Sequence, residues 1–315
     1  MRWLLYVYLL ASLNTYAAEQ ATSHDWLKTL AFAGHGTDFS GDFVYQHNSQ
    51  IETFRISHIV ASDSEYEKVI SLDGPKQEIV RHHGQTWCYR NHKMVQVANQ
   101  QGYAKFPSRL LANISDLKVL YRVQEVAKEQ VAGYLTQVVL MQSIDNLRYS
   151  HKIWVHSETG LLLKAAVLDD KNNVLEQYLF TQLKIGASAD RAWLASSQAD
   201  AKIAPSVKTD ALQDIKSGWV VDALPTGFVK VQEIMRPMSK KHAPVIQIIY
   251  SDGFGAISVF IEPSDDDEDD KEGLSSRGSV NLYQKVVGLH LYTVVGEVPA
   301  RTVMQVLDSI RFKGN

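Results

Sequence analysis

The stretch from Lys152 to Phe180, KIWVHSETGLLLKAAVLDDKNNVLEQYLF, decides the fold class of this chain of 315 residues. It predicts three strands joined by two turns, because residues 157–160 (SETG) and 171–173 (KNN) tolerate tight or left-handed backbone. Between the turns, β-branched and aromatic residues alternate with charged ones, as an antiparallel meander with one buried face requires. The stretch contains no pattern typical of a catalytic centre.

Strand-like segments flank this meander on both sides. In the first part of the chain they lie near residues 41–47, 51–60, 66–72, 77–82, 93–98 and 121–142. After Gly218 a new series lies near residues 228–235, 245–250, 254–262, 278–284 and 288–295. Helices are expected at residues 24–33, 107–120 and 189–196, and after Pro299, where Val303, Val306, Leu307 and Ile310 share one face.

These elements predict an α+β protein that is mostly antiparallel β and has two domains. An antiparallel sheet of close to ten strands must curl, split or close. Residues 18–196 are therefore expected to form a large curled sheet with covering helices. Residues 197–217, rich in Ala, Ser, Lys and Asp, predict a linker. Residues 218–315 predict a smaller α+β C-terminal domain, near the size of an independent folding unit.

The first 17 residues have the features of a secretory signal peptide. Arg2 supplies the positive charge, and residues 3–13 form an apolar segment shorter than the roughly 20 residues that span a bilayer. Small residues before the end of the peptide favour cleavage after Ala17, with cleavage after Ala18 as the alternative. No second long apolar run follows, so the sequence predicts a soluble exported protein.

The charge pattern argues against nucleic-acid binding. The formal net charge is −3, and the acidic run at residues 265–270 (DDDEDD) alone contributes −6, so the rest of the chain is close to neutral. Nucleic-acid-binding domains usually carry a basic stripe, which this balance does not suggest. The acidic run is expected to be a solvated loop, because closely spaced like charges repel. It lacks the alternating acids and the glycine of an EF-hand calcium loop.

The nearest approach to a set of metal ligands is formed by His82, His83, Cys88 and His92. Gly84 marks a turn among them, and strands on either side would direct the side chains to both faces, so no metal site is expected. Cys88 is the only cysteine, so no intramolecular disulfide forms, and a buried apolar role is expected for it. Without a GKS, GxSxG or HExxH motif, the sequence predicts no catalytic residue and no cofactor.

Aromatic side chains are the clearest functional clue in the first domain. Most of them are expected to lie in the core, while a subset would line an apolar groove for acyl chains or a peptide. The groove candidates are Trp26, Phe43, Tyr45, Phe54, Trp154, Tyr178 and Phe180.

Several short segments occur in an order that spans nearly the whole chain. They are residues 41–45 (GDFVY) with 51–55 (IETFR), 71–81 (SLDGPKQEIVR), Trp219 with 224–225 (LP) and 227–228 (GF), 250–253 (YSDG), and 294–299 (VVGEVP). This ordered set resembles the MucB/RseB family of periplasmic negative regulators of the extracytoplasmic-stress sigma factor, sigma-E.

The resemblance implies a first domain similar to the half-barrel of bacterial lipoprotein carriers, and a location in the periplasm. It also implies that the chain binds the periplasmic domain of a membrane anti-sigma factor and shields it from proteolysis. Envelope-stress ligands, lipopolysaccharide or lipoprotein acyl chains, would release the regulator. The alternative is a periplasmic lipid or lipoprotein carrier, and a hydrolase ranks last. A carrier alone needs no second domain, which favours the regulator, whereas homo-oligomerisation stays open.

Overall fold

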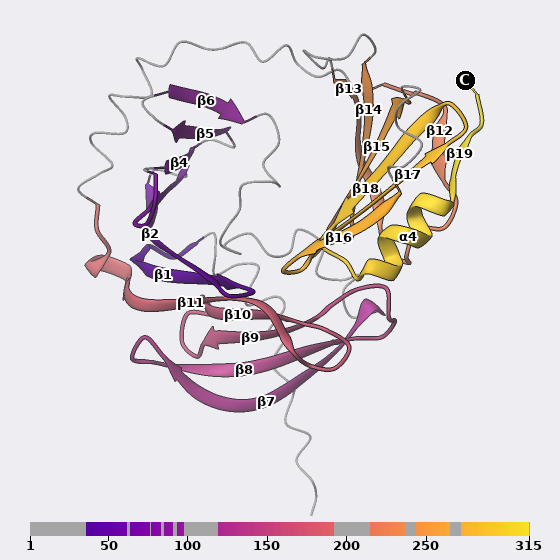
Figure 1. The fold of residues 1–315 in the computed structure, drawn as a ribbon. Helices are drawn as coiled ribbons and strands as arrows, with labels where there is room; N and C mark the ends of the chain where they lie inside the picture. The colour runs from indigo at the N-terminus through magenta and orange to yellow at the C-terminus, as the bar shows by residue number, and fades with distance from the viewer. Residues whose placement is uncertain are drawn as a thin grey trace, which may run out of the picture.

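The computed structural model describes residues 36–61, 64–75, 77–82, 85–90, 93–97, 119–191, 215–236, 244–264 and 272–314. These residues form two antiparallel sheets, one in each domain, and a short two-stranded ribbon (Figure 1). Some predicted features lie outside the described residues: the signal peptide at 1–17, Trp26 with the helix at 24–33, the acidic run at 265–270, and linker residues 197–214.

The first domain is a sheet of 11 strands in the order β6-β5-β4-β3-β2-β1-β11-β10-β9-β8-β7. The strands are β1 (Phe39–His47), β2 (Gln50–Ala61), β3 (Ser64–Ser71), β4 (Gln77–His82), β5 (Gln85–Arg90), β6 (Lys93–Val97), β7 (Tyr121–Val131), β8 (Tyr134–Ser143), β9 (Ser150–His156), β10 (Leu162–Leu168) and β11 (Val174–Ile185). Strands that follow each other in sequence are paired, except β6 and β7, and β1 pairs in addition with β11. The sheet therefore consists of two runs of strands joined along β1 and β11 (Figure 1).

The predicted meander is confirmed as β9, β10 and β11. Its first turn contains Gly160, whose φ of +76° suits glycine, and its second contains Asn172 at φ +63°. Asp169 stabilises the second turn, because its Oδ1 accepts hydrogen bonds from the N–H groups of Lys171 (2.8 Å) and Asn173 (2.7 Å). Local turn chemistry thus fixes the two connections that the sequence indicated.

The junction of β1 and β11 requires glycine at one position. A Cβ on Gly41 would collide with the carbonyl oxygen of Gln182 on β11. The register shifts by one residue just after this point, between Asp42 and Phe43. The close approach lets Phe43 pack against the Phe180 ring of β11, with 6.0 Å between ring centroids.

The prediction of a curled half-barrel with covering helices is met only in part. β6 and β7 form the two edges, and no ladder of hydrogen bonds joins them within the described residues, so the sheet is open. Of the expected helix at 107–120, only residues 119 and 120 are described. Hydrophobic periodicity reports which face of a strand is buried and does not report how far a sheet bends.

The second domain is a six-stranded sheet in the order β13-β14-β15-β18-β17-β16, with one helix against it. Its strands are β13 (Val229–Arg236), β14 (Val245–Ser251), β15 (Ala256–Pro263), β16 (Gly273–Arg277), β17 (Val280–Val287) and β18 (His290–Gly296), and the ribbon is β12 (Trp219–Val221) with β19 (Ile310–Phe312). Helix α4 (Ala300–Asp308) buries Val303, Val306 and Leu307, as predicted. Ile310 is buried too, but it begins β19, because the helix ends at Asp308.

Two further observations complete the fold. A short 3₁₀ helix, η2 (Gly186–Ser188), follows β11. Of the helix expected at residues 189–196, only residues 189–191 are described, and these three are not helical. Within the ranges that the structure describes, no helix has the length and apolar character needed to cross a membrane.

Candidate functional site

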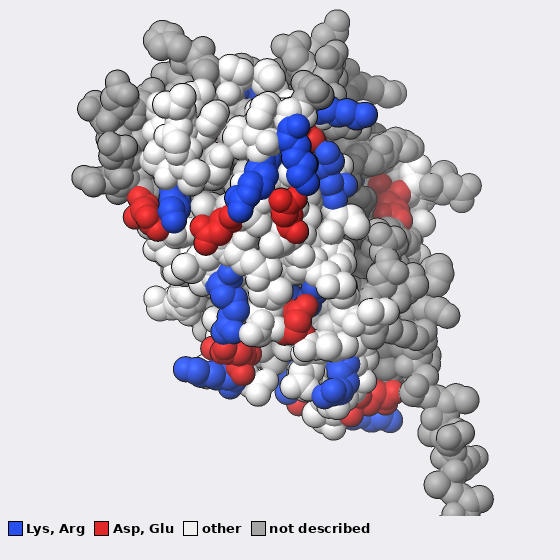
Figure 2. Space-filling view, turned by 90° about the vertical axis from the view of Figure 1, so that its right-hand side faces the viewer, with Lys and Arg blue, Asp and Glu red and all other residues white. Residues whose placement is uncertain are grey.

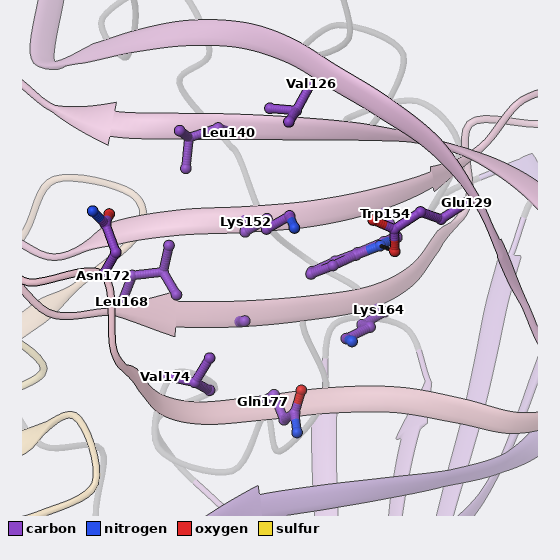
Figure 3. Close-up of a pocket in the computed structure, with 11 residues that line it drawn as sticks. Val126, Glu129, Leu140, Lys152, Trp154, Lys164, Leu168, Asn172, Val174 and Gln177 are labelled. Atoms are coloured by element: carbon purple, nitrogen blue, oxygen red, sulfur yellow. Dashed lines mark hydrogen bonds between the residues drawn. The ribbon is translucent and has the colours of Figure 1, made fainter.

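A pocket of about 500 Å³ opens on one face of strands β7 to β11 (Figure 3). Its aliphatic lining consists of Val126, Leu140, Ala166, Leu168 and Val174. Polar groups come from Glu129, Lys152, Lys164, Asn172 and Gln177, and the ring of Trp154 lies among them. An apolar cavity of this size with a few polar groups is the usual form of a site for a small molecule. We refer to it as the Trp154 pocket.

Three charged side chains surround the indole ring of Trp154. The Nε1–H of Trp154 donates a hydrogen bond to Glu129 Oε2 at 2.7 Å. Lys152 Nζ and Lys164 Nζ lie 4.8 Å and 4.3 Å from the ring centroid, within the range of cation–π attraction. The register explains this arrangement, because Lys164 lies opposite Trp154 on β10 and Lys152 lies two residues earlier on the same face of β9.

The Trp154 pocket has an excess of positive charge, with two ammonium groups beside one carboxylate. Burial lowers the pKa of Lys164, Glu129 opposes that shift, and the like charge of Lys152 adds to it. An anion placed between the two lysines would offset their mutual repulsion and favour their charged forms. The pocket therefore suits a molecule that combines an apolar chain with an anionic group.

The predicted groove residues gather in one core, but among the described candidates only Trp154 lines the pocket. Phe43, Phe54 and Phe180 are at most 4% exposed in that core, and the register places Phe43 and Phe180 on the opposite face of the sheet from Trp154. Tyr45 and Tyr178 stack on each other with 4.6 Å between ring centroids and pack against the same core. The three phenylalanines are buried in the core, and Trp26 lies outside the described residues.

Sequence reasoning missed the two lysines and Glu129. The alternating pattern predicted one buried face for the meander, whereas both faces of β9 are covered. Trp154 is buried on one face, and Ile153 and Val155 belong to a separate core on the other. The signal that could have identified the site is a lysine two residues before a tryptophan, with a second lysine across the next turn.

The second candidate feature is the contact between the domains, which centres on loop 144–149 between β8 and β9. Arg148 donates from Nη1 to Asp252 Oδ2 at 2.7 Å and from Nη2 to the carbonyl oxygen of Thr226 at 2.5 Å. Both side chains of the ion pair are at most 2% exposed. The guanidinium also lies 5.9 Å and 5.6 Å from the ring centroids of Tyr121 and Phe228. We call Arg148, Asp252 and Thr226 the domain clamp.

Polar contacts on either side of the domain clamp join the same two domains. The Thr302 hydroxyl on α4 donates to the carbonyl oxygen of Leu147 at 2.8 Å, and Asn281 Nδ2 donates to the Tyr149 hydroxyl at 2.8 Å. Arg301 pairs with Asp170 at 3.0 Å in an exposed position. Loop 144–149 therefore provides three consecutive residues, 147 to 149, that bind the second domain.

Other classes of site find little support in the described part of the chain. No group of three or more His, Cys, Asp or Glu side chains there could hold a metal ion. Cys88 is buried on β5, His82 stacks on Tyr66 with 3.9 Å between ring centroids, and His83 and His92 lie outside the described residues. On the face drawn in Figure 2, basic and acidic side chains are interspersed rather than gathered into a stripe.

Comparison with known families gives two matches that together span most of the chain. The model of the MucB/RseB N-terminal domain matches residues 22–198, and that of the MucB/RseB C-terminal domain matches residues 213–311.

Individual relatives agree with this result. The sigma factor AlgU regulatory protein MucB of Pseudomonas aeruginosa is 34% identical over 319 residues, covering 99% of this chain and 98% of the relative. The sigma-E factor regulatory protein RseB of Escherichia coli K12 is 24% identical over 307 residues, covering 96% and 94%. Among solved structures, the complex of Pseudomonas aeruginosa MucA and MucB aligns with a TM-score of 0.73 and 30% identity, covering 92% of this chain and 99% of the other.

Proposed function

The chain belongs to the MucB/RseB family of regulatory binding proteins, which are not enzymes, and on that premise we propose that it binds the periplasmic part of a membrane anti-sigma factor. One observation carries the proposal: the likeness to MucB in its complex with MucA extends over 92% of this chain, and therefore over both domains. The sigma factor under control would serve envelope stress, in line with the names AlgU and sigma-E among the relatives.

The proposed place of action is the periplasm, after removal of residues 1–17. The short apolar segment behind Arg2 supports export, and the partner crystallised with a related MucB is the periplasmic part of MucA. Bound there, the chain would shield the anti-sigma factor from proteolysis, because a protease must engage an exposed and extended segment.

We further propose that an amphipathic envelope molecule releases the partner by binding the Trp154 pocket. The aliphatic walls suit an acyl chain, and Lys152 and Lys164 suit the phosphate of lipopolysaccharide or another anionic group. The ligand can displace the partner only if it binds the partner-free state more tightly.

A lipid or lipoprotein carrier is the second candidate, and the same pocket favours it. A carrier, however, has no use for the buried Arg148–Asp252 pair that joins the first domain to the second. Burying such a pair carries a large desolvation cost, which is easier to understand if the arrangement of the domains matters for function.

Isothermal titration of the anti-sigma factor's periplasmic domain into the mature chain, with and without lipopolysaccharide, tests the proposal. We expect tight binding that lipopolysaccharide weakens at least tenfold, or by about 1.4 kcal/mol. Replacing Lys152 and Lys164 by alanine should remove that effect and leave partner binding intact. Lys184→Ala, an exposed lysine of β11 outside the pocket, is the matched control.

The outcomes separate the candidates. Absence of partner binding would reject the regulator. Partner binding that lipopolysaccharide does not alter would leave a constitutive shield. Binding of lipopolysaccharide without any partner binding would identify a carrier.

A further inference from the structure

Two turns at one end of the Trp154 pocket are also contacts of the second domain. Loop 144–149 joins β8 to β9, and these strands place the pocket residues Leu140 and Lys152 opposite each other. The turn between β10 and β11 follows the same pattern, since Leu168, Asn172 and Val174 around it line the pocket. Because alternate turns of an antiparallel meander lie at the same end, the two turns lie together.

Each of these turns binds the second domain directly. Loop 144–149 carries Arg148 of the domain clamp, and Asp170 in the other turn accepts a hydrogen bond from Arg301 of α4 at 3.0 Å. In Figure 3 the pocket residues Leu168 and Asn172 mark this end of the pocket. One end of the pocket is thus built from the elements that hold the domains together.

Loop 144–149 is braced so that it moves as a unit with its strands. Asp145 Oδ1 accepts hydrogen bonds from the N–H of Leu147 at 3.0 Å and from Arg148 Nε at 3.2 Å. At its base, the Ser150 hydroxyl accepts a hydrogen bond from the N–H of Ser143 at 3.1 Å. A shift of β8 against β9 would therefore be passed to the guanidinium of Arg148 rather than absorbed within the loop.

We propose that the domain clamp couples occupation of the Trp154 pocket to the arrangement of the two domains, with Arg148 as the positioning residue. This inference rests on the proposed function, since it explains how a ligand of the first domain weakens binding of the anti-sigma factor. An acyl chain between the walls of the pocket would shift β8 against β9 and so disturb the Arg148 contacts with Asp252 and Thr226. By thermodynamic reciprocity, binding of the partner must lower the affinity for the ligand by the same factor.

The test uses the full mature chain and a single-chain anionic lipid, lysophosphatidylglycerol, below its micellar concentration. Small-angle X-ray scattering gives the radius of gyration with and without lipid, tryptophan fluorescence gives lipid affinity, and titration gives partner affinity. The variants are Arg148→Met, Arg148→Lys and, from the other domain, Asp252→Asn. Arg301→Met is the control, because it removes an exposed contact between the same domains.

In the unsubstituted chain, lipid should change the radius of gyration and lower the affinity for the partner at least tenfold. Arg148→Met and Asp252→Asn should bind lipid within twofold of the original affinity, yet show no lipid-dependent change in either quantity. Arg148→Lys should restore part of the response, since it keeps the charge but not both hydrogen bonds. Arg301→Met should respond like the unsubstituted chain.

Two results would overturn the inference. One is an unsubstituted chain whose radius of gyration does not change when lipid binds. The other is an Arg148→Met variant that circular dichroism shows to be folded and that keeps the full response to lipid. The scattering and lipid measurements need no partner. A failure of anti-sigma factor binding would therefore reject the proposed function alone and leave this test intact.

Discussion

Breaking the buried ion pair between Arg148 and Asp252 is expected to lower the free energy of unfolding by about 3–5 kcal/mol. Arg148→Met leaves the Asp252 carboxylate buried at 1% exposure without its counter-charge. Asp252 Oδ1 would still accept the N–H groups of Phe254 (3.0 Å) and Gly255 (2.9 Å), so the local turn should persist. The loss therefore falls on the contact between the domains rather than on the turn.

The magnitude follows from the contacts that methionine cannot make. Arg148 donates two charged hydrogen bonds across the domains, at 2.7 Å to Asp252 and at 2.5 Å to the carbonyl of Thr226. Hydrogen bonds to charged groups are each worth about 1.5–3 kcal/mol, so two of them account for the expected range. Methionine keeps much of the apolar stem, which limits the loss of packing against Tyr121 and Phe228.

A double-mutant cycle isolates the pair from its surroundings. Asp252→Asn alone should lower the free energy of unfolding by a similar amount. The double variant Arg148→Met with Asp252→Asn should lower it by about 2–3 kcal/mol less than the sum of the two single effects. The pair Arg301–Asp170 is the matched control, since its side chains are 49% and 61% exposed. Exposed pairs contribute at most about 1 kcal/mol, so its cycle should show little coupling.

Urea unfolding of the mature chain, followed by circular dichroism and by tryptophan fluorescence, measures these energies. Two probes are needed because a chain of two domains can unfold in more than one step. A coupling below about 0.5 kcal/mol, no larger than that of the exposed control, would refute the reasoning that a buried clamp holds the domains.

Four other predictions concern pH, packing and processing. Burial lowers the pKa of His151 to about 4, so between pH 6.5 and 4 the unfolded chain binds more protons than the folded chain. The free energy of unfolding should therefore fall by about 2–3 kcal/mol as the pH drops through this range. In urea unfolding measured at a series of pH values, His151→Phe should remove most of that fall. Gly41→Ala should lower the free energy of unfolding by about 1–3 kcal/mol, as measured by thermal melts. Gly273→Ala, with open space around the added methyl group, should have almost no effect. Limited trypsin digestion should cut first within residues 197–217 or 264–273. N-terminal sequencing of the exported protein should begin at or very near Ala18 rather than at Met1.

The parts of the fold that follow from local chemistry could be predicted from the sequence. Turn residues such as Gly160 and Asn172 determine their own backbone, so the meander is found where they indicate. The apolar face of α4 depends only on helical spacing, and Val303, Val306 and Leu307 are all buried. In both cases the information lies within a few residues of the element.

The rest depends on partners far apart in the chain. Arg148 reads as part of a polar loop, and its partners Thr226 and Asp252 follow 78 and 104 residues later. The Trp154 pocket requires the register between β9 and β10 together with covered surfaces on both sides of the sheet. Sequence periodicity identifies a buried face, but it does not reveal when a charged face such as that of Lys152 is also covered.

The pairing of β1 with β11 also has a consequence for the order in which the first domain can fold. The Tyr45 hydroxyl donates to Glu176, which follows it by 131 residues. As the chain emerges from its N-terminal end, β1 is available for some time before its partner strand. The hairpins from β1 to β6 can form during that time, but one long edge of β1 stays unpaired, and unpaired strand edges favour aggregation. A factor that holds the emerging chain until β11 arrives should therefore raise the yield of folded protein more than one that accelerates hairpin formation.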